Sequence, residues 1–99
     1  MTNATAILYY EEHPKKRDQH HVALIFPDLR DAGFTACHTV GNSREDVLEA
    51  GVEILEFALE EAVEKGIVLP AATPLLKVNM DHGDDDFKPF RIIVEEISI

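Results

Sequence analysis

The residues best suited to chemistry in this sequence are five histidines, one cysteine and a large set of carboxylates. His20 and His21 are adjacent, so on a strand their side chains would point to opposite faces. His13, His38 and His82 lie in separate segments, and no ligand spacing typical of a zinc site links them. The pattern predicts no metal site and no cofactor.

Cys37 is followed directly by His38, and these residue types form the catalytic pair of thiol enzymes. Both residues fall on an expected strand, where neighbouring side chains point to opposite faces. The thiol would then lie away from the imidazole that must activate it, so an ordinary strand pair is predicted. A lone cysteine also forms no disulfide within the chain, which gives no sign of an oxidising compartment.

The acidic run DHGDDD at residues 81–86 has some likeness to a calcium loop. An EF-hand loop alternates its acidic ligands and ends on a distant bidentate glutamate, and this run does neither. We therefore expect a solvated turn and no calcium site.

The chain carries 9 basic and 19 acidic side chains, which gives a formal net charge of -10. This charge repels a phosphate backbone and offers no counterion release, so direct nucleic-acid binding is not expected. It suits a basic protein partner, whose approach the field of the protein would steer. The same charge also suits a protein that needs it only for solubility, and the composition leaves both interpretations open.

The length of 99 residues allows one domain with one modest core, so residues 1–99 are interpreted as a single domain. The first residues lack the basic flank and apolar stretch of a signal peptide. No apolar run approaches the roughly 18 residues that would span a bilayer. We expect a cytoplasmic protein with no membrane segment.

Three segments rich in β-forming side chains come first, at residues 6–11, 22–26 and 34–40. The polar break between the first two contains a proline, and the connection between the second and third is also short. Short connections favour an antiparallel meander of the three strands.

The run FPDL at residues 26–29 ends the second strand, because Pro27 removes a ladder donor and Asp28 favours a turn. Residues 30–33 complete the reversal of the chain. On the third strand, alternation places these side chains on one face: Phe34, Ala36, His38 and Val40.

A long helix is predicted over residues 43–65. Ser43 and Asp46 have the spacing of a capping box, and Gly66 is placed to end the helix in the left-handed conformation. At 1.5 Å per residue the helix extends about 34 Å, enough to cross a four- or five-stranded sheet diagonally. Its apolar stripe consists of Val47, Leu48, Gly51, Ile54, Leu55, Ala58, Leu59, Ala62 and Val63.

The chain closes with an extended connector at residues 70–74, a possible short strand at 75–80 and a final strand at 90–99. After a helix that covers the sheet, the final strand can return beside the first one as a right-handed crossover. The predicted class is therefore α+β: a three-stranded antiparallel meander, one long helix across the sheet and a returning strand, in the order β-β-β-α-β.

Acidic side chains on the helix form a second pattern, opposite the apolar stripe. Like charges four residues apart cost a few tenths of a kcal/mol per pair, and only Glu61 has a clear basic partner, Lys65. The ridge fits either a docking face for a basic protein or a plain solvated helix face. Its members are Glu49, Glu53, Glu56, Glu60 and Glu64.

The predicted element order is that of the ribonuclease H-like core, which raises the hypothesis of a nuclease. Two-metal chemistry of that kind needs carboxylates that converge from the first strand, the helix and the later strand. The middle of the first strand is Leu8-Tyr9-Tyr10, and the last strand carries Glu95 and Glu96 but no aspartate. We predict no catalytic residues and no enzymatic activity, and a degenerate metal-dependent nuclease is the less favoured alternative.

Several stretches in this order resemble the HicB antitoxin family. They are VALIFPDL at residues 22–29, the strand opening GFT at 33–35, the helix opening GNSREDVLEA at 41–50, and Pro70. Family members show a strand that ends in FPDLPG and a helix that opens with S/T-x-E-E-A. The resemblance covers about two thirds of the chain, from residue 6 to residue 70.

The resemblance implies a partial ribonuclease H-like domain that binds and occludes HicA, a small basic toxin that cleaves messenger RNA. Many members continue into a DNA-binding segment, and this chain is expected to have none after Ile99. The side chains predicted to face the partner are Asp28, Asp31, Glu49, Glu53, Glu56 and Glu60.

Self-association is a further expectation, because the closing strand has apolar side chains at an end of the sheet that could pair with a second copy. A homodimer is predicted on this ground. An orphan self-associating module is the alternative to an antitoxin.

Overall fold

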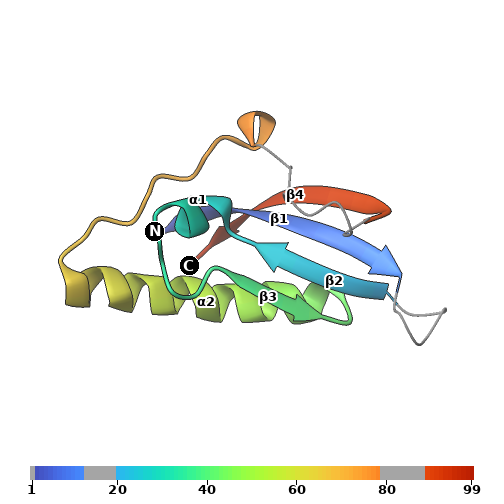
Figure 1. The fold of residues 1–99 in the computed structure, drawn as a ribbon, viewed down its shortest axis with the longest axis horizontal. Coiled ribbons are helices and arrows are strands. Elements are labelled where there is room, and N and C mark those ends of the chain that lie inside the picture. Colours follow the sequence, from blue (N-terminus) through green and yellow to red (C-terminus); the bar gives the residue numbers. More distant parts are fainter. Residues whose placement is uncertain (1, 13–19, 79–88) are drawn as a thin grey trace.

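The computed structural model describes residues 2–12, 20–78 and 89–99 (Figure 1). Within these ranges the protein is α+β with one long helix, as predicted, and its sheet has four antiparallel strands. The elements are β1 (Asn3–Glu12), β2 (His20–Ile25), α1 (Pro27–Asp31), β3 (His38–Gly41), α2 (Arg44–Lys65), the 3₁₀ turn η1 (Leu75–Lys77) and β4 (Arg91–Ser98).

The sheet has the strand order β3-β2-β1-β4, and every neighbouring pair is antiparallel. Leu8 at the centre of β1 pairs with Leu24 on one side and with Ile93 on the other. The final strand thus lies beside the first, where it was expected. The predicted right-handed crossover is wrong, because such a crossover joins parallel strands and β4 runs antiparallel to β1.

The direction of β4 follows from where the chain reaches it. Thr73 contacts Thr5 near the start of β1, whereas the Phe90 N–H donates to the Tyr10 carbonyl near its end, at 2.9 Å. Residues 73 and 90 thus lie near opposite ends of β1. β4 therefore starts at the Tyr10 end and runs against β1.

The FPDL run forms a short helix, α1, where the sequence predicted only a turn. Pro27 stands in the first turn of α1 and has no amide hydrogen to leave unpaired, and Gly33 takes φ 83° just beyond its end. The N–H of Phe34 then donates to the carbonyl of Leu29 at 3.0 Å. Phe34 is buried in the core instead of lying on a sheet face.

The third strand is consequently shorter than predicted. β3 begins at His38, so the expectation of a strand from residue 34 is wrong for its first four residues. The alternation that would have placed Phe34 and Ala36 beside His38 does not apply, because residues 34–37 form a loop between α1 and β3, and Thr35 bonds to Glu61 of α2. One bond of that region is sheet-like: the Phe26 N–H donates to the Cys37 carbonyl at 2.8 Å.

Both predicted ends of α2 are confirmed. The Ser43 hydroxyl accepts a hydrogen bond from the Asp46 N–H at 3.2 Å, which satisfies one of the free donors of the first turn. Gly66 takes φ 65° at the other end, a conformation that side chains with a Cβ disfavour.

The core lies between α2 and one face of the sheet (Figure 1). Gly51 allows the closest approach, since a Cβ there would lie 3.1 Å from the Ile97 Cδ1 and 3.2 Å from the Leu24 Cδ1. Leu55 is fully buried beside them. The helix residues buried in this layer are Val47, Gly51, Ile54, Leu55, Ala58 and Ala62.

Val63 departs from the predicted stripe, because its side chain is 82% exposed. At about 100° per residue it lies roughly 130° around the helix from the middle of the buried positions. Leu48 and Leu59, also assigned to the stripe, are half-buried at its margin.

The sheet face away from α2 carries Thr5, Ile7 and Tyr9, and each of these side chains is buried. Residues 70–74 form the expected extended connector, but Leu75–Lys77 is a 3₁₀ turn, so the strand predicted from residue 75 is wrong there. The Lys77 N–H donates to the Pro74 carbonyl at 2.8 Å, and the Leu76 side chain is exposed. The predicted turn at residues 81–86 and most of the first hairpin loop lie outside the described residues.

Truncation of Leu55 should cost far more stability than truncation of Val63. Leu55→Ala removes a fully buried side chain and is expected to lower the free energy of unfolding by about 2 to 5 kcal/mol. Val63→Ala should change it by no more than about 0.5 kcal/mol, because the site is exposed. Urea denaturation followed by circular dichroism measures both, and equal losses would contradict this placement of the core.

Candidate functional site

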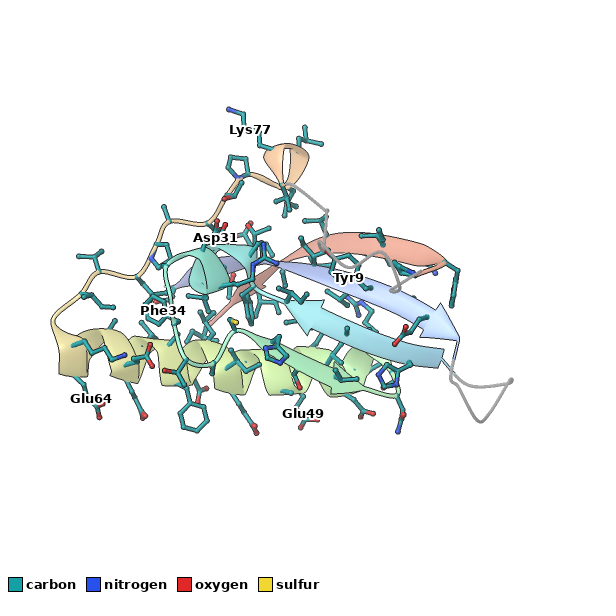
Figure 2. The ribbon with its side chains drawn as sticks, viewed as in Figure 1. Tyr9, Asp31, Phe34, Glu49, Glu64 and Lys77 are labelled. Atoms are coloured by element: carbon teal, nitrogen blue, oxygen red, sulfur yellow. The ribbon has the colours of Figure 1, made fainter. Side chains whose placement is uncertain are left out.

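The outward face of α2 gathers five acidic side chains. Glu49 and Glu64, near its two ends, both point away from the sheet (Figure 2). Steps of three and four residues place the set on one side of the helix, opposite the buried stripe. All five are exposed, and within the described residues none forms an ion pair: Glu49, Glu53, Glu56, Glu60 and Glu64, which we call the acidic ridge. The structure thus brings together all four of the glutamates predicted to face a partner.

An aromatic side chain stands beside the acidic ridge. Phe57 is 61% exposed, and it shares a hollow of about 250 Å³ with Glu53, Glu56 and Glu60. The sequence analysis did not single it out. A helical wheel could have found it, since position 57 falls outside the buried stripe and next to Glu53 and Glu64.

A groove runs between α2 and the segment that leads into β3. It has a volume of about 400 Å³, and Phe34 and Ala36 form its wall on one side while Phe57 and Glu60 stand on the helix side. Glu60 also lines a third hollow together with Val63. The surface around Glu60 therefore combines negative charge with exposed apolar area.

Glu61 closes this groove and has a structural role. Its carboxylate accepts hydrogen bonds from the Thr35 N–H at 3.2 and 3.4 Å and lies 3.8 Å from the Lys65 Nζ, the ion pair expected from the sequence. Hydrogen bonding from Thr35, followed by the charge of Lys65, lowers the pKa of the Glu61 carboxyl below its ordinary value. Glu61 thereby fixes the segment at residues 34–36 against the helix.

Asp28 and Asp31, the other predicted partner-facing residues, lie away from the acidic ridge. Asp31 is exposed on the side of the molecule opposite to that faced by Glu49 and Glu64 (Figure 2), and its Oδ1 is 3.4 Å from the Arg30 Nε. Asp28 is engaged within the fold. Its two carboxylate oxygens accept from the N–H of Thr73 at 2.9 Å and from its hydroxyl at 2.6 Å.

The bonds to Asp28 belong to a tie between α1, the connector and the sheet. The carbonyl of Thr73 accepts a hydrogen bond from the buried hydroxyl of Thr5 at 2.5 Å. Three polar groups of Thr73 are thus satisfied at one point, and residues near 73 are held over the sheet face that α2 leaves uncovered. Asp28 supports the fold here, and Asp31 stays a separate candidate contact.

The carboxylates of the last strand do not converge. Arg44 donates through Nε to the Glu95 Oε2 at 3.0 Å and through Nη2 to the Glu95 Oε1, and this partner raises the pKa of Arg44. Glu96, one residue on, belongs to the opposite sheet face and is exposed. In the described part of the chain, no three His, Cys, Asp or Glu side chains are grouped so that they could hold a metal ion.

Cys37 and His38 lie closer than expected, with 3.9 Å between the thiol sulfur and the imidazole Nδ1. The expectation that they face apart is wrong, because Cys37 precedes β3 and does not follow strand alternation. Cys37 is half-buried and packs against the core.

Comparison with known proteins gives no relative: no family model, curated protein or solved structure matches this chain. Among the described helices, none combines the length and apolar character needed to cross a membrane. The acidic ridge with Phe57 is therefore identified from the geometry of the chain itself.

Loss of the Glu61 carboxylate should produce a pH-dependent loss of stability. Because its pKa is lowered in the folded protein, Glu61 stabilises the fold above the pKa of an unfolded glutamate, about 4.3, and loses this effect as pH falls through the lower folded value. Glu61→Gln should lower the Tm at pH 7, and the difference from wild type should shrink below about pH 4.

Glu60→Gln is the matched control, since Glu60 is exposed on the acidic ridge and forms no ion pair within the described residues. Its Tm at pH 7 should equal or exceed that of the wild type, because the change removes like-charge repulsion. A Tm difference for Glu61→Gln that stays constant from pH 7 to pH 3 would show that the carboxylate charge is not involved.

Proposed function

We propose that this chain is a non-catalytic protein-binding domain that docks a basic protein on the outward face of α2. The observation that carries this proposal is the acidic ridge, which is exposed, lacks internal ion pairs in the described structure and adjoins the exposed Phe57. Charge alone suits solubility as well as binding. An exposed aromatic ring among carboxylates is more typical of a contact surface, because aromatic and arginine side chains dominate the energetics of protein interfaces.

The chemistry of the surface defines the partner. An arginine or lysine of the partner could lie over the ring of Phe57, with the carboxylates of Glu53 and Glu60 on either side. The net charge of -10 would speed the encounter with a positively charged protein. Aliphatic parts of the same partner would cover the apolar area near Val63.

In its specific form, the proposal is a HicB-like antitoxin that binds and occludes a small basic toxin of the HicA type in the cytoplasm. Support comes from the FPDL run that forms α1 and from the GNSREDVLEA run that opens α2. The three antiparallel strands with a helix across them fit a partial ribonuclease H-like core. The antiparallel pairing of β4 with β1 is a departure from the crossover expected of that core.

A nuclease is the less favoured function. Glu95 is occupied by Arg44, Glu96 lies on the other sheet face, and the centre of β1 offers Leu8 and Tyr9 where a carboxylate would be needed. An RNA-cleavage assay of the purified protein with Mg²⁺ tests this alternative. Cleavage that disappears in Glu95→Ala and Glu96→Ala would favour it over the binding role.

The binding role is tested first by capture and then by point variants. The immobilised protein is exposed to lysate of its source at low salt, and any small basic protein that is retained is identified, purified and titrated against it. Association should slow steeply as salt is added, because the contact is charged. In an RNA-cleavage assay, an equimolar amount of this chain should stop cleavage by such a toxin.

Two single variants with the same change in net charge locate the contact. Glu60→Lys reverses a charge of the acidic ridge next to Phe57 and should weaken binding by about tenfold or more. Glu96→Lys, on an exposed strand position away from α2, should have a much smaller effect. Phe57→Ala should also weaken binding about tenfold while the salt dependence stays unchanged.

Equal losses for Glu60→Lys and Glu96→Lys would mean that only net charge matters, and the α2 face would be rejected as the docking site. Asp31→Lys examines the remaining predicted residue in the same titration. Failure to bind any basic protein would remove the antitoxin role and favour an orphan self-associating module, for which the relevant observation is that no described strand pairs with the outer edge of β4.

A further inference from the structure

The outer edge of β4 is a long strand edge with no neighbour among the described strands. Of the strands in the described ranges, β3 is outermost on one side of the sheet and β4 on the other. β3 has only four residues, whereas β4 has eight. Because a row of unpaired backbone groups is a template for another strand, the longer edge offers the better site.

The residue that follows β4 shows which backbone groups of the strand face β1. Thr2 and Ile99 exchange both of their hydrogen bonds, at 3.1 and 2.9 Å. In an antiparallel ladder such pairs recur at every second residue, so Ile97, Glu95 and Ile93 also direct their N–H and C=O groups to β1. The N–H and C=O groups of the alternate residues, Ile92, Val94 and Glu96, therefore point to the free edge.

The side chains of β4 complement those of a second β4. Ile92 is 38% exposed and Val94 is half-buried on the sheet face away from α2. On the α2 face, Arg91 and Glu95 stand four residues apart with opposite charges. Within its own chain Arg91 lies over the Tyr10 ring and Glu95 binds Arg44, so the contact with a second copy would add to these two interactions. In an antiparallel pair of identical strands centred on Ile93, each Arg91 lies opposite a Glu95 of the other copy, and each Ile92 lies opposite a Val94.

Other registers also let the outward backbone groups of the two strands bond to each other, but they do not set each Arg91 opposite a Glu95. A shift that centres the pair on Val94 sets Glu95 opposite Ile93, and a centre at Glu95 sets the two like charges against each other. A centre at Ile92 sets Arg91 opposite Ile93. Charge complementarity therefore selects the register centred on Ile93.

We propose that a second copy of this chain pairs with β4 in the antiparallel register centred on Ile93, which joins the two sheets into one. The contact is isologous, so both copies use the same edge. The two-fold axis is perpendicular to the sheet, and both α2 helices therefore lie on the same side of it. The two acidic ridges would face one direction and form a double negative surface.

This self-association is independent of the binding of a basic partner, and salt separates the two. Each copy carries a net charge of -10, so added salt screens the repulsion between copies and should strengthen the dimer. The same salt should weaken any contact between the acidic ridge and a basic protein.

The test is sedimentation equilibrium of the whole chain over a concentration series, at about 0.1 and 0.5 M salt. The wild type should dimerise, and more tightly at the higher salt. Arg91→Glu and Glu95→Lys should each weaken dimerisation about tenfold, because each sets two pairs of like charges opposite one another. An equimolar mixture of the two variants should recover the wild-type affinity, since every opposed pair in the mixed dimer again has opposite charges.

Recovery in the mixture is the decisive outcome, because a variant that merely failed to fold would not be rescued by the other. Val40→Lys on β3, the opposite edge, is the control and should leave the dimer unchanged. A wild type that stays monomeric at the highest concentration, a dimer lost in Val40→Lys, or variants that remain weak when mixed would overturn the proposal.

Discussion

The packing of α2 against one face of the sheet is the constraint on which the rest of this protein depends. A chain of 99 residues can build only one sizeable core, and here that core consists of one helix stripe and the central strands. Gly51 sets the distance between the layers, because Leu24 and Ile97 fill the space that a Cβ would need. Once this stripe is turned inward, the orientation of every other α2 side chain is fixed.

The acidic ridge is the direct consequence of that orientation. Its glutamates repel one another at a cost of a few tenths of a kcal/mol per pair, and basic side chains could relieve this repulsion. Two basic side chains that the structure describes on α2 bind other carboxylates: Lys65 pairs with Glu61, and Arg44 pairs with Glu95. The negative charge on α2 is thus left for solvent or for a partner.

The path of the chain after α2 places β4 at the outer edge of the sheet. Thr73, held by Asp28 and Thr5, keeps the connector over the sheet face opposite the helix, and the chain then enters β4 from the Tyr10 end of β1. β4 becomes an edge strand as a result. The helix face and the strand edge lie on different elements, so one surface can be occupied without blocking the other.

The sequence alone determined the parts of the fold that depend on local chemistry. Ser43 and Gly66 bound the helix because a hydroxyl and a left-handed glycine satisfy free backbone groups within one turn. The spacing of the glutamates placed them opposite the buried stripe for the same local reason. The antiparallel sheet of short-connected strands was also predictable.

Where a segment could adopt more than one local conformation, only the tertiary structure decided which one it adopts. Residues 34–37 have the pattern of a strand but form a loop, in which Phe34 is buried in the core and Thr35 bonds to Glu61 of α2. Asp28 looked like a surface acid until Thr73, 45 residues away in the chain, was placed against it. The direction of β4, the exposure of Val63 and the position of Phe57 beside Glu60 likewise depend on contacts between distant segments, which no short window of sequence contains.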